Sequence, residues 1–74
     1  WEVSYDADKQ IYRVFGGKIE KFACRTNFDQ FESVNRLRDI MRRYGIAHEL
    51  MRQGATGDSL VQIGESTPFT LVEQ

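Results

Sequence analysis

The chain has 74 residues, of which 41% are hydrophobic and 28% charged, and its net charge is −1. These totals are typical of one small folded domain with a single core, and they exclude a disordered chain. No apolar run approaches the roughly 20 residues that a membrane helix needs, so we expect no membrane contact. The lone Cys24 excludes an internal disulfide and fits a reducing compartment such as the cytoplasm. One cysteine and one histidine cannot build the usual zinc sites.

The first residue is Trp1 rather than methionine, so we expect residues 1–74 to be a single domain that was processed or excised from a longer protein. Charge is unevenly spread along this domain. Residues 9–52 hold all ten lysines and arginines and only five acids, whereas the flanks carry six acids and no base. A basic middle between acidic ends predicts a positive patch, provided that those side chains share a face.

Three strands are predicted at the N-terminal end. Residues 1–5 alternate apolar and polar side chains, as a half-buried strand does, and residues 6–9 form a turn. Residues 10–15 are rich in β-branched and aromatic side chains and predict a second strand. The Gly-Gly pair at 16–17 favours a tight hairpin turn because both glycines accept positive φ, so residues 18–26 are expected to form the third strand.

One helix is predicted over about residues 28–44. Apolar side chains recur there with the helical period, at positions 31, 34, 37, 40, 41 and 44. Asn27 or Asp29 can cap its first turn, and Asp29 with Glu32 resembles a capping box. Gly45 predicts its end, because glycine readily takes the left-handed conformation that closes a helix.

Residues 47–52 are predicted as a strand, 53–58 as a hairpin loop and 59–64 as another strand. Pro68 breaks the pattern, and residues 69–73 are expected to form one more short edge strand. The order is therefore strand, strand, strand, helix, strand, strand, with that short strand added. It predicts an α+β fold in which an antiparallel sheet carries a single helix packed on one face.

The predicted hairpins set a register and two faces. With Phe15 opposite Lys18 and Val3 opposite Tyr12, directly opposed residues share a face. One face is then the core side, with Trp1, Val3, Tyr5, Tyr12, Val14, Ile19 and Ala23. The other face carries a row of alternating charge, in which cross-strand ion pairs join Glu2, Arg13 and Glu20.

Apolar side chains share the outer face with that charged row, namely Ile11, Phe15, Phe22 and Cys24. Two aromatic rings and an isoleucine should not lie bare together on a monomer. The simpler interpretation is that the C-terminal segment folds over them with Phe69, Leu71 and Val72. The functional interpretation is a protein-binding surface.

The predicted helix carries four arginines in two classes. Acids and arginines four residues apart, in the favoured acid-first orientation, form the pairs Glu32–Arg36 and Asp39–Arg43. Arg38 and Arg42 have no matching acid on the helix. The simpler interpretation is that Arg42 serves the C-terminal carbonyls of the helix, while the stem of Arg38 packs beside the apolar stripe and its head reaches water. The functional interpretation is that this pair binds a carboxylate cluster, a phosphate or a base.

No catalytic constellation is predicted. His48 is the only histidine, and strand alternation sends it and Glu49 to opposite faces. Cys24 is interpreted as a small apolar filler rather than a nucleophile. Residues 54–59 contain two glycines but lack the lysine and the following helix of a phosphate-binding loop. We therefore expect a non-enzymatic domain with no cofactor and no metal site.

The leading functional prediction is a protein-interaction or regulatory module. It binds a protein partner, or a second copy of itself as a homodimer, through a sheet face or an exposed strand edge. Its candidate residues are Ile11, Phe15, Phe22, Arg38 and Arg42. The alternative, favoured by the basic middle and opposed by an acidic pI of about 5.8, is nucleic-acid binding through Lys21, Arg25, Arg38, Arg42 and Arg52. A purely structural domain of a larger chain is the third class.

Overall fold

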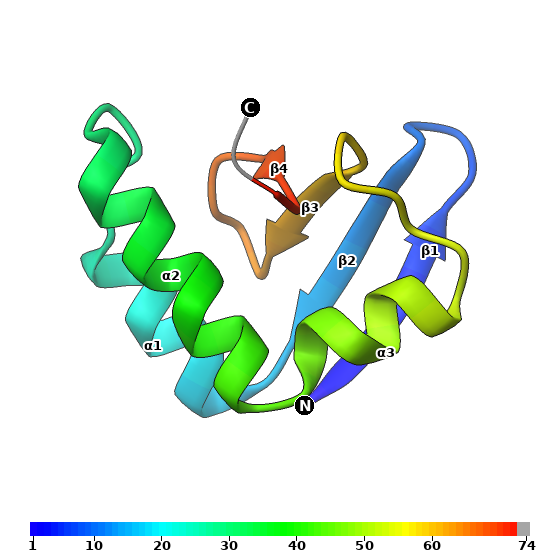
Figure 1. Cartoon of the computed structure of the whole chain (residues 1–74), viewed down its shortest axis with the longest axis horizontal. Helices are drawn as coiled ribbons and strands as arrows, with labels where there is room; N and C mark the ends of the chain where they lie inside the picture. Colours follow the sequence, from blue (N-terminus) through cyan, green and yellow to red (C-terminus); the bar gives the residue numbers. More distant parts are fainter. Residues whose placement is uncertain (73–74) are drawn as a thin grey trace.

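Four strands form one mixed sheet, and three helices pack against one of its faces (Figure 1). The computed structural model describes residues 1–72. In chain order the elements are β1 (Glu2–Asp6), β2 (Ile11–Phe15), α1 (Gly17–Arg25), α2 (Phe31–Arg43), α3 (Ile46–Arg52), β3 (Leu60–Ile63) and β4 (Phe69–Thr70). The α+β class holds, but the expectation of an antiparallel sheet with a single helix is wrong.

The strands lie side by side in the order β1-β2-β3-β4. β1 is antiparallel to β2 and β4 is antiparallel to β3, but the central pair, β2 and β3, is parallel. A parallel pair needs a long crossover connection, and the three helices supply it between the end of β2 and the start of β3. The antiparallel prediction failed because it counted two of these helices as strands and so left no crossover.

The first of those two helices is α1, which replaces the predicted third strand. Ile19, Phe22 and Ala23 have the spacing of one helix face, but Ile19 and Ala23 also fit one face of a strand, with Phe22 on the other. In the structure Ile19 and Ala23 are buried, and Phe22 packs against the edge of the core. The predicted hairpin failed because one short apolar segment fitted two periods.

Gly16 precedes α1 instead of turning a hairpin. Its backbone N–H donates a hydrogen bond of 2.9 Å to the Glu20 carboxylate one turn along the helix. A Cβ atom placed on Gly16 would lie 2.9 Å from the Cβ atom of Trp1, so this position needs glycine for the close approach of the N-terminal residue. The glycine pair thus marks a strand-to-helix junction.

α2 confirms the predicted central helix, although its first turn begins later than expected. Gln30 lies at its N-cap, and no side chain of residues 1–72 caps it. The Asn27 side chain instead accepts a hydrogen bond from the backbone N–H of Asp29 in the preceding loop. The predicted end is confirmed, since Gly45 takes the left-handed conformation with φ of 78°.

α3 is the second helix that was predicted as a strand. It follows Gly45 directly and buries one side, with Ile46, Ala47 and Leu50 in the core. That spacing is helical, but a segment of seven residues is too short for periodicity to decide between helix and strand. The loop of residues 53–58 therefore joins a helix to β3 and is not a hairpin.

Both N-terminal strands are confirmed, with a register shifted by two residues. Val3 pairs with Val14 and Tyr5 with Tyr12, because the turn occupies residues 7–10 instead of 6–9. A shift of two keeps every side chain on its predicted face. The predicted charged row is nevertheless wrong, because Arg13 lies between Ser4 and Gln62, and Glu20 belongs to α1.

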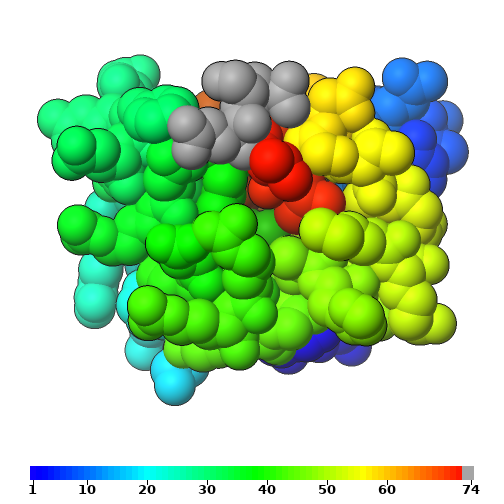
Figure 2. All heavy atoms as spheres, in the orientation of Figure 1, coloured from blue at the N-terminus to red at the C-terminus, as the bar shows by residue number. Residues whose placement is uncertain are grey.

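The strand predicted at 59–64 is confirmed as β3, and the last strand is reduced to the two residues of β4. Its predicted end, Glu73, lies outside the described residues. Phe69 and Leu71 are buried in the core beneath the helices, so the C-terminal segment does not cover the outer sheet face as expected. On the helix side, residues 70–72 (red) lie between α2 and the loop that follows α3 (Figure 2).

One hydrophobic core holds the sheet and the helices together. Tyr12 and Val14 of β2 and Val61 and Ile63 of β3 all point into it, as do buried residues of the three helices. Within residues 1–72 no helix is long and apolar enough to cross a membrane.

Candidate protein-binding surfaces

The sheet leaves one face without a covering helix among the described residues. Side chains alternate along a strand, so burying Tyr12 and Val14 sends their neighbours on β2 to the opposite side. Ile11 and Phe15 of β2 and Leu60 of β3 are the apolar side chains on that side. Ile11 pairs directly with Leu60 across the parallel ladder. Phe15 is 38% exposed and Leu60 40% exposed, while Ile11 is half-buried. We call this surface the open sheet face.

Arg13 lies in the middle of the open sheet face and is held by several groups. Its guanidinium carbon is 5.1 Å from the centroid of the Phe15 ring, within the range of a cation–π interaction. Its Nη2 atom donates to the carbonyl oxygen of Gly64 at 3.2 Å and lies 4.0 Å from the exposed Glu65 carboxylate. The arginine therefore lies along the face and presents a polar centre between apolar side chains.

Polar side chains surround this centre. The register places Ser4 and Gln62 on either side of Arg13, and Asp6 at one end of the row that contains Ile11 and Leu60. A face with a few apolar anchors among polar groups has the composition of a reversible protein–protein interface rather than of a permanent one.

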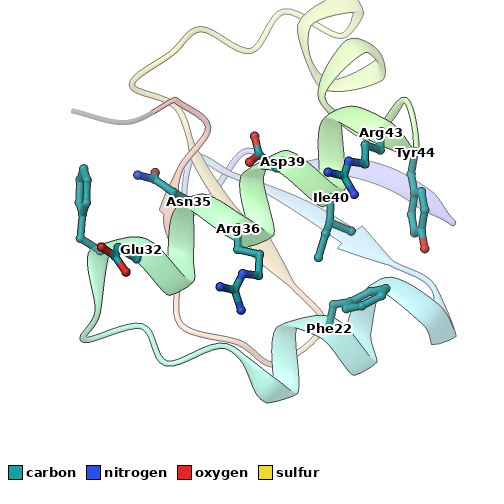
Figure 3. Close-up of a pocket in the computed structure, with 9 residues that line it drawn as sticks. Phe22, Glu32, Asn35, Arg36, Asp39, Ile40, Arg43 and Tyr44 are labelled. Carbon is teal, nitrogen blue, oxygen red and sulfur yellow. The ribbon is translucent and has the colours of Figure 1, made fainter.

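A second surface lies between α1 and α2 (Figure 3). It is a groove of about 730 Å³. Its walls and floor comprise Phe22, Phe31, Glu32, Asn35, Arg36, Asp39, Ile40, Arg43 and Tyr44. Ile40 and Arg36 point from α2 toward α1, and Phe22 points from α1 toward them. We call this surface the α1–α2 groove.

The floor of the α1–α2 groove is apolar and partly aromatic. Phe22 and Tyr44 meet edge to face, with ring centroids 6.4 Å apart. The Lys18 ammonium lies 5.6 Å from the Tyr44 centroid, which adds a cation beside the floor. Phe22, Ile40 and Tyr44 all pack against the core from its edge, so their positions are set by the fold.

The charges around the α1–α2 groove do not pair as predicted. Asp39 forms its ion pair with Arg42, three residues away, and its carboxylate points away from α1 (Figure 3). Arg43 thus lacks its expected partner, and Arg36 forms no ion pair with Glu32. Within residues 1–72, Arg36 and Arg43 make no ion pair, so the groove carries two uncompensated cations.

The structure separates the predicted partner-binding residues. Ile11 and Phe15 share the open sheet face, as the strand alternation predicted. Phe22 lies in the α1–α2 groove, because residues 17–25 form a helix rather than a third strand. Arg38 and Arg42 lie on neither apolar surface.

Arg38 has its head in the protein rather than in water, contrary to the simpler interpretation of the sequence. It is 9% exposed. Its Nε atom donates to the carbonyl oxygen of Thr70 and its Nη2 atom to the Thr70 hydroxyl, both at 2.9 Å. Its Nη1 atom donates to the Asn35 side-chain oxygen at 2.6 Å. Arg38 thus joins α2 to β4 and is not presented to a partner.

The cations of the nucleic-acid alternative do not form one free patch. Arg38 is buried, Arg42 pairs with Asp39, and Arg52 pairs with Glu49. Lys21 and Arg25 are exposed on α1. Nucleic-acid binding stays a prediction, but three of its five candidate residues already have partners within the chain.

The Arg52–Glu49 pair makes a pH prediction. Hydrogen bonds from Arg52 and then Gln53 lower the pKa of Glu49 from 4.5 to about 2. A carboxyl pKa that is lower in the folded state stabilises the fold above the unfolded pKa, and this stabilisation is lost as the pH falls from about 4.5 toward 2. An NMR titration of the side-chain carboxyl carbons should find Glu49 still ionised at pH 3.5 (~1 unit below its ordinary pKa).

Arg52→Gln is expected to raise the pKa of Glu49 toward its ordinary value, because it removes the largest cause of the shift. Arg42→Gln is the matched control, since Arg42 pairs with a different carboxylate. An unchanged Glu49 titration in Arg52→Gln would show that the pair does not persist in solution.

Two residues of the sequence discussion lie at the surface. Cys24 is free and exposed on α1, so it is not the apolar filler that strand alternation suggested. His48 is exposed on α3. Within residues 1–72, no cluster of three or more histidine, cysteine, aspartate or glutamate side chains could hold a metal ion.

Sequence reasoning missed Leu60 on the open sheet face and Arg36, Ile40 and Arg43 in the α1–α2 groove. The exposed position of Leu60 depends on the parallel pairing of β2 with β3, for which no local signal exists. The seven-residue spacing of Arg36 and Arg43, with Ile40 between them, can be read from the sequence. It was not interpreted as a binding pattern, because each arginine was assumed to pair with the acid four residues before it.

Comparisons with known proteins identify relatives of this chain. Residues 1–70 match the family DUF1967, described as a domain of unknown function. GTPase Obg of Tropheryma whipplei (strain Twist) is 40% identical over 63 residues, which cover 85% of this chain and 14% of that protein. GTPase Obg of Elusimicrobium minutum (strain Pei191) is 34% identical over 53 residues, covering 72% of this chain and 12% of that protein. The chain thus spans less than one sixth of these relatives. No solved structure gives a significant match.

Proposed function

This chain belongs to the DUF1967 family, and we propose that it is a non-catalytic protein-binding domain of an Obg-type GTPase. The open sheet face is the docking surface, and its partner is the part of the GTPase that lies outside the segment matched by this chain. The observation that carries the proposal is the set of apolar side chains on the sheet face left uncovered by any helix of the described residues: the paired Ile11 and Leu60, and Phe15 four residues along β2 beyond Arg13.

The composition of the open sheet face supports a domain–domain contact. Interfaces between domains of one chain resemble transient protein interfaces and are more polar than permanent ones. Phe15 and Leu60 provide apolar anchors, while Arg13, Ser4 and Gln62 provide polar groups in the row between them. Arginine and aromatic residues are enriched at the centres of such interfaces.

The relatives supply a partner at high effective concentration. In both GTPases the matched segment is a small part of one polypeptide, so the rest of that polypeptide is tethered to it. Tethering turns docking into an intramolecular event, and an interface too weak for two separate proteins can then be occupied. A modest apolar face such as this one is therefore sufficient.

The proposal that the domain itself is not catalytic rests on its loop chemistry. Residues 54–59 contain two glycines, as a phosphate-binding loop would, but no lysine. They lead into β3 rather than into a helix, whose N-terminus would face a phosphate. Thr56 instead hydrogen-bonds with Asp58 and Ser59 within the loop. We further propose a cytoplasmic location, which the free thiol of Cys24 favours.

Homodimer formation through the sheet edge has less support. β1 is an edge strand, and a second copy could extend the sheet by pairing with it. In an antiparallel pair of β1 strands centred on Ser4, however, Glu2 of each copy faces Asp6 of the other. Like charges directly opposite each other destabilise a strand pair. The edge therefore disfavours its own copy.

The test is a titration of this chain into GTPase Obg of Tropheryma whipplei from which the matched segment has been removed. Binding is measured by calorimetry, and GTP hydrolysis is measured with and without the added chain. We expect Phe15→Ser/Leu60→Ser to weaken binding by about thirtyfold, since each side chain contributes on the order of 1 kcal/mol at an interface centre. We also expect docking to change the hydrolysis rate, as a regulatory domain would.

The matched control is Met51→Ser/Val72→Ser, which removes two exposed apolar side chains that line neither the open sheet face nor the α1–α2 groove. It should leave binding unchanged. If both double variants weaken binding equally, or if the unmodified chain does not bind at all, the open sheet face is not the docking surface.

A further inference from the structure

The α1–α2 groove has a pattern that the open sheet face does not explain. Arg36 and Arg43 are seven residues apart on α2, about 10 Å along the helix axis. Ile40 lies between them on the same side and points toward α1 (Figure 3). The sequence along the groove is therefore cation, apolar floor, cation, at intervals of four and three residues.

The balance of charge around this pattern is positive. The Asp39 carboxylate is neutralised by Arg42 and points away from α1, which leaves Glu32 as the groove carboxylate that forms no ion pair within residues 1–72. Against it stand Arg36, Arg43 and, beside the Tyr44 ring, Lys18. The floor beneath these cations is formed by Phe22, Ile40 and Tyr44.

We propose that the α1–α2 groove binds an acidic amphipathic helix of a protein partner. Its carboxylates lie seven residues apart and contact Arg36 and Arg43, and the apolar side chains between them pack on Ile40 and Phe22. Two turns of a partner helix span the same distance of about 10 Å as the two turns of α2 between the arginines. Recognition of an amphipathic helix in an apolar groove requires this combination of anchors and flanking charge.

The same chemistry disfavours a nucleic acid in the groove. Glu32 lies on the groove wall, where it would repel phosphate. A partner carboxylate is also a good match for the planar guanidinium, with which it forms paired hydrogen bonds.

The test uses a fluorescent synthetic helix of about 15 residues, with two glutamates seven residues apart and two leucines between them. Fluorescence anisotropy measures its binding to the intact chain. A second peptide carries lysines in place of the two glutamates, and a single-stranded RNA of similar charge is the third probe. We expect the glutamate peptide to bind more tightly than the other two probes, and salt to weaken its binding.

Arg36→Gln/Arg43→Gln is expected to weaken binding of the glutamate peptide by about tenfold. The variant loses two exposed ion pairs, which also fix the orientation of the bound peptide helix. The matched control, Lys9→Gln/Arg52→Gln, changes the net charge equally at two exposed sites outside the groove and should bind as the unmodified chain does. A reciprocal variant, Arg36→Glu/Arg43→Glu, should prefer the lysine peptide.

Three results would overturn the proposal. Equal loss in the control variant would mean nonspecific attraction to net charge. Equal affinity for the glutamate and lysine peptides would mean that the arginines do not select the occupant. Tighter binding of the RNA, abolished in Arg36→Gln/Arg43→Gln, would assign the groove to a nucleic acid. The open sheet face variant Phe15→Ser/Leu60→Ser should leave all these affinities unchanged, so this result is independent of the proposed GTPase docking.

Discussion

Leu50→Ala is expected to lower the free energy of unfolding by about 3 kcal/mol, the central value for truncating a fully buried leucine. Leu50 is 0% exposed and lies in the core from α3. The loss combines the transfer free energy of the removed methyl groups with the cavity that they leave. A domain of this size has only about 5 kcal/mol of stability in total, so the melting temperature should fall by roughly 15 °C.

Met51→Ala provides the control, because Met51 is the next residue on α3 and is 52% exposed. Its truncation should change the free energy of unfolding by less than about 0.5 kcal/mol. Urea denaturation followed by circular dichroism measures both variants. Similar losses for the two variants would mean that α3 does not bury the side that the structure assigns to it.

The part of the fold that could be predicted was local. The helix over residues 31–43 combines a long run of helical periodicity with a glycine at its end, and both signals lie within one segment. Alternation in residues 2–6 and 11–15 likewise placed Val3, Tyr5, Tyr12 and Val14 on the same face. A register error of two residues left these faces intact, because the period of a strand is two.

The part that could not be predicted depends on contacts between distant segments. Residues 17–25 and 46–52 are too short for periodicity to distinguish a helix from a strand. Their conformation is decided by packing on a sheet whose central pair is parallel. A parallel pair needs a long crossover connection, which helices supply here. Predicting helical segments as strands therefore removed both the crossover and the parallel pairing of β2 with β3.

The two candidate surfaces show the same limit. Ile11 and Phe15 were found by alternation within one strand, but their neighbour Leu60 is reached only through the pairing of β2 with β3. Phe22 was assigned to the same surface as Phe15, and the helical conformation of α1 moves it to the groove. The topology thus divides these two residues between two surfaces.

Arg38→Ala is expected to lower the free energy of unfolding by about 2 kcal/mol, within the range for hydrogen bonds made by a buried charged group. Arg38 donates to the backbone oxygen and the hydroxyl of Thr70 and to Asn35. Its guanidinium also lies 5.9 Å from the Phe69 ring centroid. Removing it breaks the link between α2 and β4 and leaves the Thr70 carbonyl without that donor. Arg38→Lys should recover only part of the loss, because an ammonium cannot reproduce the planar fork.

Arg42→Ala is the matched control for this arginine. Arg42 lies one turn further along α2, is exposed and pairs only with the exposed Asp39 among the ion pairs of residues 1–72. Exposed pairs of this kind contribute less than about 1 kcal/mol, so Arg42→Ala should be nearly neutral in the same denaturation experiment. Hydrogen exchange should show faster exchange at Leu71 in Arg38→Ala alone, because its amide bonds to Ser59 beside the strand that Arg38 holds. If the two alanine variants are equally stable, Arg38 does not hold β4 in place.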